Sequence, residues 1–272
     1  MSAVDAAVTA ATSLGVICTD PVVLHDRANV VIHLRPAAVI ARVATLTARI
    51  RPGVASWFRR DALLASHAAA RGVLTTRPFA PVVTVDGFAV GLWHHEPHDS
   101  SCSVSPDDAA ARLFELHVAL ADYAGPLPRS GPCEDVLRAL PLVTAPPSVL
   151  AALTAEVERL RSALAAFPAR PLHGDAHPGN LLATPAGLMW NDFEDTWRGP
   201  LGWDLACLAT SGRIDGAAAV AAYPEPVPAE ELAACVELRE LLGVVWRFVL
   251  ADRFPAEHAR AEADLERWLA RR

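Results

Sequence analysis

Two stretches, HGDAHPGN (residues 173–180) and NDFED (residues 191–195), decide the predicted fold and chemistry of this 272-residue chain. Both stretches are dense in polar residues and lie between short apolar runs. Asp175 and Asn180 are five residues apart, the D-x-x-x-x-N spacing of a phosphotransfer catalytic loop. In such a loop the aspartate accepts the proton of the substrate hydroxyl and the asparagine holds a metal ion.

The chain between the two stretches predicts a small hairpin, with strands at residues 181–183 and 188–191. A hairpin folds the chain back, so we expect Asn180 and Asp192 to meet at one Mg²⁺ that bridges nucleotide phosphates. Because an ordinary aspartate has a pKa near 4, Asp175 is a weak base. A loose transition state requires little proton removal, so Asp175 would mainly orient the acceptor hydroxyl.

The composition is that of a globular protein, with 52% hydrophobic and 20% charged residues. The net charge of −7 argues against a nucleic-acid partner and favours a cationic one. The five cysteines are scattered and form no C-x-x-C pair, which predicts free thiols in a reducing cytoplasm. The N-terminus has no basic region typical of a signal peptide, and the apolar runs are too short to span a bilayer.

The first part of the chain is predicted to form an antiparallel sheet. Three short runs rich in valine and isoleucine predict strands at residues 21–25, 30–34 and 39–43. A helix over residues 57–71, with Ser56 as its N-cap, is expected next. Asp86-Gly87 then predicts the turn of a hairpin between residues 82–85 and 88–93.

After residue 93 the pattern becomes polar and then mainly helical. Helical spacing of apolar residues predicts four helices, at residues 106–123, 148–167, 229–253 and 256–271. The sequence therefore predicts an α+β protein with two lobes. A small antiparallel β lobe (residues 1–93) is followed by a hinge (94–104) and a larger, mainly helical lobe (105–272).

Together with GPLGWDLA (residues 199–206), the stretches at 173–180 and 191–195 resemble the aminoglycoside phosphotransferase and choline kinase-like family, relatives of the protein kinases. The looser resemblance covers nearly the whole chain. It implies a bilobal protein kinase-like fold that binds ATP, or alternatively GTP, with Mg²⁺ in the cleft. The implied activity is O-phosphotransfer to a small molecule.

The resemblance also implies roles for individual residues. Asp175 would be the catalytic base, and Asn180 and Asp192 the Mg²⁺ ligands. The backbone of His94, His95 and Glu96 would contact the adenine. The catalytic loop would be supported by Asp204, whose carboxylate holds backbone amides, and by His173, which packs beneath the metal loop.

The sequence departs from the family pattern at the nucleotide phosphates. The family usually has a strand lysine paired with a helix glutamate, but this chain contains no lysine. The corresponding positions are Arg42 and Asp61, and we expect the longer arginine to be offset by the shorter aspartate. The loop Asp26-Arg27-Ala28-Asn29, which would cover the nucleotide, has no glycine.

Two other interpretations use the same residues differently. His173, Asp175, His177 and Asp192 could together bind Zn²⁺ or a di-metal centre for phosphoester hydrolysis. Alternatively, the missing lysine and the glycine-poor loop would suit a non-catalytic nucleotide-binding pseudokinase.

The acceptor is the least specified part of the prediction. Glu194 and Asp195 follow the metal aspartate and are candidates for the acceptor site. In aminoglycoside-modifying relatives, acidic residues of the region that holds Glu237 and Glu240 bind ammonium groups, although here a solvated helix face is favoured. An aminoglycoside-like antibiotic is the first candidate acceptor, and an amino alcohol or sugar is the second.

Overall fold

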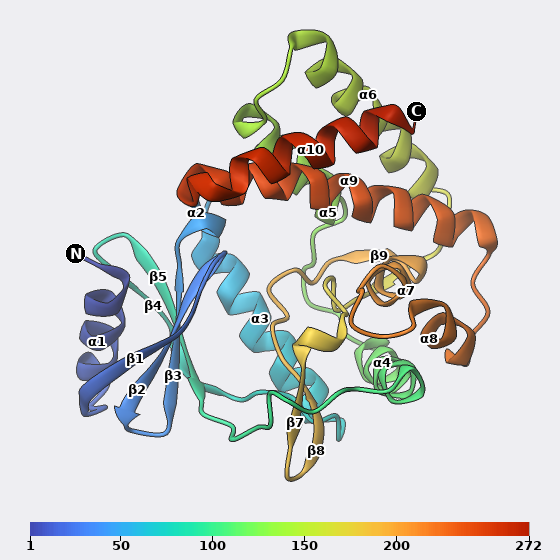
Figure 1. The fold of residues 1–272 in the computed structure, drawn as a ribbon. Coiled ribbons are helices and arrows are strands. Elements are labelled where there is room, and N and C mark those ends of the chain that lie inside the picture. The colour runs from blue at the N-terminus through green and yellow to red at the C-terminus, as the bar shows by residue number, and fades with distance from the viewer. Residues whose placement is uncertain (272) are drawn as a thin grey trace. The chain divides into compact units, whose positions relative to one another are not determined.

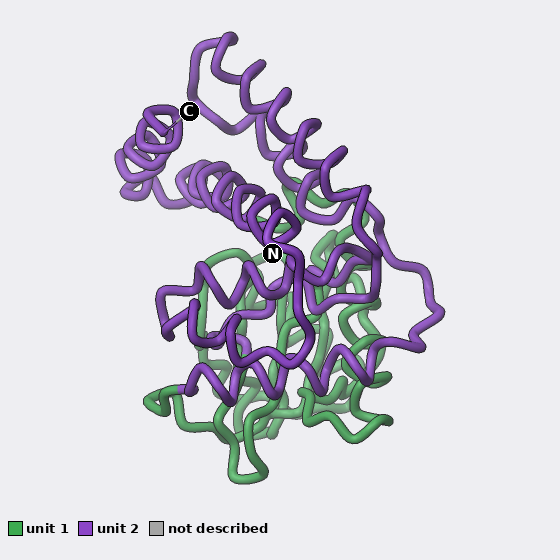
Figure 2. Tube along the Cα trace, turned by 90° about the vertical axis from the view of Figure 1, so that its right-hand side faces the viewer, with its two compact units in different colours: residues 1–103, 181–194 green, residues 104–180, 195–272 purple. Residues whose placement is uncertain are grey.

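The computed structural model describes residues 1–271, which form two compact units (Figure 2). Unit 1 comprises residues 1–103 and 181–194, and unit 2 comprises residues 104–180 and the chain from 195 onward. The segment 181–194 therefore groups with the β-rich unit, whereas the sequence placed it in the larger helical lobe. Arg272, the last residue of the predicted helical lobe, lies outside the described residues.

Unit 1 is built on a five-stranded antiparallel sheet in the order β1-β2-β3-β5-β4 (Figure 1). Its strands are β1 (Cys18–Asp26), β2 (Asn29–Pro36), β3 (Val39–Ala44), β4 (Pro78–Val85) and β5 (Phe88–His94). All three predicted strands and the predicted hairpin are confirmed. Asp86 and Gly87 both have positive φ angles, of 47° and 82°. A two-residue Asp-Gly turn requires that conformation.

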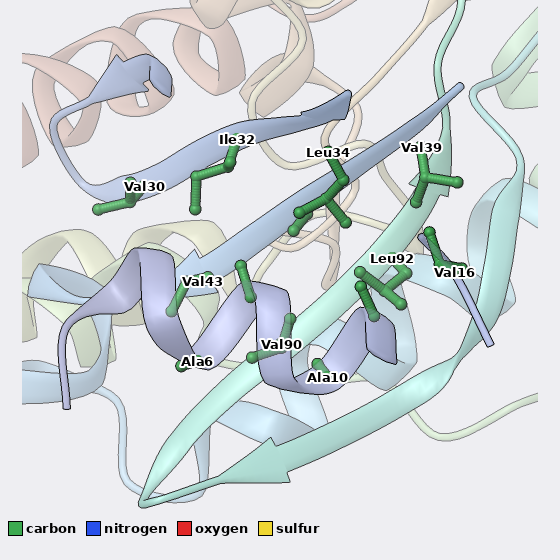
Figure 3. Close-up of a cluster of buried hydrophobic side chains, with 13 residues drawn as sticks. Ala6, Ala10, Val16, Val30, Ile32, Leu34, Val39, Val43, Val90 and Leu92 are labelled. Carbon is green, nitrogen blue, oxygen red and sulfur yellow. The ribbon is translucent and has the colours of Figure 1, made fainter. Parts of the chain in front are cut away.

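Helix α1 (Ala3–Ser13), which the sequence analysis did not predict, packs on this sheet (Figure 3). The face of α1 that carries the small side chains of Ala6 and Ala10 contacts the apolar core that includes Ile32 and Leu92. Ser2 caps the helix through a capping box with Asp5, in which each side chain accepts from the other residue's backbone N–H. That S-x-x-D pattern was the available sequence signal for this helix.

Helices α2 (Leu46–Ile50) and α3 (Val54–Ala69) follow β3. The predicted N-cap of α3 is wrong: the helix begins after Gly53, and the Ser56 hydroxyl donates to the Gly53 carbonyl. Gly53 has a left-handed φ of 66°, which permits the sharp entry into the helix.

The hairpin of β7 (Leu181–Thr184) and β8 (Gly187–Trp190) is confirmed, and backbone hydrogen bonds connect it to the rest of unit 1. Trp190 donates its N–H to the Leu74 carbonyl at 2.9 Å, and Thr76 donates to the Trp190 carbonyl at 2.9 Å. These bonds explain why residues 191–194, which follow β8 directly, belong to the β-rich unit.

Unit 2 is mainly helical, as predicted. Its helices of seven or more residues are α4 (Pro106–Leu120), α5 (Gly131–Ala139), α6 (Pro147–Leu164), α7 (Gly202–Ala209), α8 (Gly216–Ala222), α9 (Ala229–Arg253) and α10 (His258–Ala270). The bounds of α9 match the prediction residue for residue. The short strands β6 (Ala169–Pro171) and β9 (Arg198–Pro200) pair antiparallel, and residues 173–180 and 191–195 lie between them along the chain. Among residues 1–271, no helix is both long enough and apolar enough to cross a bilayer.

Candidate active site

The predicted catalytic loop, residues 173–180, follows β6 in unit 2 and is anchored by Asp204 of α7. The Asp204 carboxylate is fully buried. Its Oδ2 accepts from the backbone N–H of His173 at 2.8 Å, and its Oδ1 accepts from that of Gly174 at 2.9 Å. Nε2 of His117 lies 2.9 Å from Oδ2. Three polar contacts therefore satisfy a carboxylate that would otherwise be costly to bury.

Gly174 allows the loop to pack closely against the backbone at Asp195. Its φ of +91° is left-handed, and a Cβ at this position would lie 2.0 Å from the carbonyl oxygen of Asp195. Only glycine fits such a contact. Trp203 also donates its indole N–H to the Gly174 carbonyl at 2.7 Å. The backbone beside Asp175 is therefore held on both its N–H and carbonyl sides.

Asp175 presents a partly exposed carboxylate at the centre of the loop. Arg239 of α9 donates from Nη2 to its Oδ1 at 2.6 Å, and Nε2 of His177 lies 3.4 Å from its Oδ2. Burial acts to raise the pKa of Asp175, but attraction to the Arg239 guanidinium and the contact with His177 outweigh it. The pKa of Asp175 is consequently held well below its usual range, so the carboxylate is ionised at neutral pH and is a weak base.

Asn180 closes the same loop with its side chain nearly buried. Its amide nitrogen donates to the Asp175 backbone carbonyl at 2.9 Å. This hydrogen bond orients the amide so that Nδ2 faces the loop, which leaves the Oδ1 oxygen as the side chain's acceptor. An amide oxygen of this kind suits a hard divalent cation.

In unit 1, Arg42 of β3 forms an ion pair with Asp61 of α3. The Arg42 side chain is 8% exposed and that of Asp61 is 0% exposed. The guanidinium carbon of Arg42 lies 5.0 Å from the ring centroid of Phe58 and 5.5 Å from that of Trp93. Aromatic faces stabilise a desolvated guanidinium, and its planar shape suits this packing better than an ammonium would. The pair inferred from sequence therefore forms, deep in unit 1.

The Arg42–Asp61 pair extends to Asp192. Arg42 also contacts Oδ1 of Asp192, and Asp61 accepts the backbone N–H of Phe193 at 2.9 Å through Oδ1. Asp192 has a φ of 67°, a left-handed conformation that aspartate tolerates better than most residues. One buried carboxylate thus fixes both the arginine and the backbone immediately after Asp192.

The two candidate acceptor residues, Glu194 and Asp195, lie in different surroundings. Glu194 is buried in unit 1, where it accepts from Asn29 Nδ2 at 3.0 Å and from Arg51 Nη1 at 3.2 Å. Asp195 belongs to unit 2 and is partly exposed. The Asn29–Glu194 bond attaches the glycine-free loop to the residues after Asp192.

The predicted hinge residues follow the end of β5. The backbone N–H of His94 donates to the Arg77 carbonyl at 2.9 Å, and that of His95 donates to the Ala38 carbonyl at 3.0 Å. The His95 ring stacks on His33, with centroids 4.2 Å apart. Burial and the nearby His33 lower the pKa of His95, which favours the neutral form of the His95 ring. Two backbone donors of this segment are therefore already committed to unit 1.

No group of three or more His, Cys, Asp and Glu side chains among residues 1–271 is arranged to hold a metal ion. His173 is fully buried, and its Nδ1 accepts the backbone N–H of Asp175 at 3.3 Å. The oxygen donors singled out for Mg²⁺ are distributed over both units, with Asn180 in unit 2 and Asp192 in unit 1. A carboxylate and an amide oxygen are donors that Mg²⁺ accepts, usually with several waters.

Sequence reasoning missed Arg239, His117 and Arg51. Arg239 sits in an ordinary amphipathic helix pattern, 64 residues from Asp175 in sequence. His117 occupies an apolar helix face, and Arg51 lies just after a five-residue helix. None of these positions belongs to a spaced motif, so only the fold identifies their partners.

Solved structures with the same fold include several small-molecule kinases. The choline kinase LicA from Streptococcus pneumoniae is 18% identical, covers 95% of this chain and 97% of its own, and has a TM-score of 0.64. The GDP and kanamycin complex of APH(2")-IIia is 16% identical, with 97% of each chain covered and a TM-score of 0.68. The amicoumacin kinase hAmiN, in complex with AMP-PNP, Ca²⁺ and Ami, is 12% identical, covers 95% and 93%, and has a TM-score of 0.69.

These likenesses confirm the predicted protein kinase-like α+β fold. Comparison with curated protein sequences gives no significant match. The sequence profile of the phosphotransferase enzyme family matches residues 40–226, more than half of the chain. The chain belongs to this family, and the predicted enzyme class, a phosphotransferase for small-molecule hydroxyl groups, is confirmed.

Proposed function

We propose that the chain transfers the γ-phosphoryl group of ATP to a hydroxyl of a small molecule, with Asp175 orienting that hydroxyl. The observation that carries this proposal is the partly exposed Asp175 carboxylate, on a loop whose backbone Asp204 and Trp203 hold in place. A preorganised carboxylate of low pKa suits hydrogen bonding to a hydroxyl in a loose transition state better than early proton removal.

Asn180 and Asp192 are the proposed Mg²⁺ ligands. Each has an oxygen donor suited to Mg²⁺, and each is held by a backbone or side-chain contact of its own unit. The ion, when bound with nucleotide, would neutralise charge on the phosphates. The amicoumacin kinase structure contains a nucleotide analogue with Ca²⁺, which supports a requirement for a divalent cation here.

Arg42 is proposed as the residue that binds the α- and β-phosphates, with Asp61 as its positioning partner. Its guanidinium already lies beside Asp192. The guanidinium has five N–H donors, so some of them can keep the contact with Asp61 while others donate to a phosphate. The backbone of His94, His95 and Glu96 is the proposed site for the adenine, with GTP as the alternative donor.

The acceptor classes to test first are aminoglycoside-like antibiotics, followed by amino alcohols and sugars. The similar structures include a kinase named for choline and a complex with kanamycin.

The test is an assay of ADP release with ATP and Mg²⁺ across aminoglycosides, amino alcohols, sugars and the carboxylate derivatives of these compounds, using Asp175→Asn as the matched control. We expect turnover that depends on one acceptor class and is lost in the variant. Nucleotide binding without acceptor-stimulated turnover anywhere would instead indicate the pseudokinase. Tightly held Zn²⁺ with phosphoester hydrolysis would indicate the metal-dependent phosphoesterase.

A further inference from the structure

Helix α9 approaches the proposed catalytic carboxylate with an arginine. Arg239 donates to Asp175 at 2.6 Å, and its guanidinium carbon lies 5.9 Å from the ring centroid of Trp203. The side chains of Arg239 and Asp175 are 24% and 23% exposed, so a small solute can reach both. A group that binds beside Asp175 therefore meets a positive charge on this helix.

Four of the five glutamates on or before α9 that would attract a cationic acceptor are occupied by other groups. Three of them pair with arginines, as Glu225 with Arg170, Glu237 with Arg159, and Glu240 with Arg271. Glu231 is buried and accepts the backbone N–H of Gly202 at 2.7 Å. Glu230 lies nine residues before Arg239, about 13 Å along the helix axis.

The charged groups near Asp175 are balanced. Asp195 attracts the Arg239 guanidinium together with Asp175. Nε of Arg213 would lie 3.3 Å from a Cβ at Gly179, which places a second guanidinium beside the loop. A third carboxylate, Asp204, is buried and already accepts from the His173 and Gly174 backbone N–H groups. The remaining two carboxylates and two guanidinium groups give no net negative charge to attract a polyamine.

We propose that the acceptor carries an anionic group, a carboxylate or a phosphate, which binds Arg239 while a neighbouring hydroxyl contacts Asp175. This inference rests on the proposed function, because it takes Asp175 as the residue that orients the acceptor. The planar fork of a guanidinium can hold Asp175 through one N–H and bind a second anion through others. Binding of that anion would draw the guanidinium partly away from Oδ1, which could then accept the hydroxyl hydrogen bond.

The test uses two matched sets of acceptors that differ only in one terminal group. Gluconate, sorbitol and glucamine share a six-carbon polyol, and glycerate, glycerol and 3-amino-1,2-propanediol share a three-carbon one. Each set contains an anionic, a neutral and a cationic member at neutral pH. For the wild-type protein we expect kcat/KM to be at least roughly tenfold higher for the anionic member than for the neutral one, with the cationic member lowest.

The variant Arg239→Gln should bring the anionic-to-neutral ratio of kcat/KM close to one, and Arg239→Lys should retain part of it. Taking the ratio within each variant cancels any effect of the substitution on Asp175 itself. The nucleotide KM should not change. Arg247→Gln is the matched control, because it removes an arginine of the same helix that pairs with Asp264 rather than with Asp175. It should keep the full preference.

The inference would be overturned if the acceptor with the highest kcat/KM were cationic or neutral, whether it belongs to these sets or to the wider panel. So would an anionic preference that survives in Arg239→Gln. Failure of the proposed function itself looks different: ATP binds, but no hydroxyl compound of any charge is phosphorylated by the wild-type protein.

Discussion

Each unit contains an arginine paired with an aspartate, and the two pairs differ mainly in exposure. In unit 1 the Arg42 and Asp61 side chains are 8% and 0% exposed, whereas in unit 2 those of Arg239 and Asp175 are 24% and 23% exposed. Removing one partner of a buried pair leaves an uncompensated charge in a medium that solvates it poorly. A partly exposed pair is screened by water and can exchange partners with a ligand.

The comparison indicates a division of roles. The buried pair sets the position of Asp192 and of the backbone at Phe193, so it acts through structure. The exposed pair sets the charge seen by whatever binds beside Asp175. Substitutions in the Arg42–Asp61 pair should therefore affect stability and nucleotide binding, and substitutions in the Arg239–Asp175 pair should affect turnover and acceptor choice.

The largest expected effect is on turnover in unit 2. Asp175→Asn should lower kcat by about 10³-fold, or about 4 kcal/mol in the transition state, because a neutral amide orients the hydroxyl less strongly than a carboxylate and cannot take up its proton late in the transfer. The free energy of unfolding should change little. Steady-state kinetics and urea unfolding of the same preparation measure both quantities. A variant that keeps most of its turnover would remove Asp175 from the proposed catalytic role.

The next largest effect is on stability in unit 1. Arg42→Met should lower the free energy of unfolding by about 3 kcal/mol, because Asp61 would be left charged and buried. Arg239→Met should cost about 1 kcal/mol or less. Arg35→Met, which breaks the exposed pair with Asp20, serves as the control for loss of a surface arginine in unit 1. Equal losses for Arg42→Met and Arg239→Met, measured by urea unfolding, would contradict the proposed contrast.

A smaller effect is expected when the Arg42 charge is kept but its shape is changed. Arg42→Lys should raise the nucleotide KM by roughly tenfold, because an ammonium group cannot bond Asp61 and reach Asp192 through a planar fork. The KM for the acceptor should stay the same. Measuring turnover against nucleotide concentration at saturating acceptor separates the nucleotide KM from the acceptor KM. An improved nucleotide KM would mean that the pocket around Arg42 still fits the lysine usual in the family.

The smallest effect is a dependence of stability on pH. The pKa of Asp175 is lowered in the folded protein, so its ionised form stabilises the fold above pH about 4. That contribution is lost as the pH falls through the lowered pKa. Because the pair is partly exposed, the change should be about 1 kcal/mol or less. Urea midpoints of wild type and Asp175→Asn should therefore differ less at pH 3 than at pH 6.

Much of the fold could be predicted from local patterns. Val- and Ile-rich runs, the Asp86-Gly87 turn and the periodicity of residues 229–253 each depend on neighbours in sequence, and each is confirmed. Helix α1 was missed because its buried face consists of alanines, which give a weak periodic signal.

The candidate site also contains both residues that local patterns predict and residues that they do not. Asp175, Asn180 and Asp192 belong to spaced motifs and were identified by spacing and resemblance. The surroundings of these residues depend on contacts between segments far apart in sequence. Asp204 is 87 residues from His117, and Glu194 is 165 residues from Asn29. No local pattern encodes such pairs, which is why the burial of Glu194 and the contact of Arg239 with Asp175 could be found only from the fold.

The use of arginine at position 42 also determines how the protein can be labelled. Amine-reactive nucleotide analogues acylate lysine side chains, and this chain has none. A guanidinium remains protonated and does not act as a nucleophile at neutral pH. Surveys of nucleotide sites that rely on lysine acylation would therefore pass over this protein. Dicarbonyl reagents, which modify guanidinium groups, should react with the accessible Arg239 well before the buried Arg42.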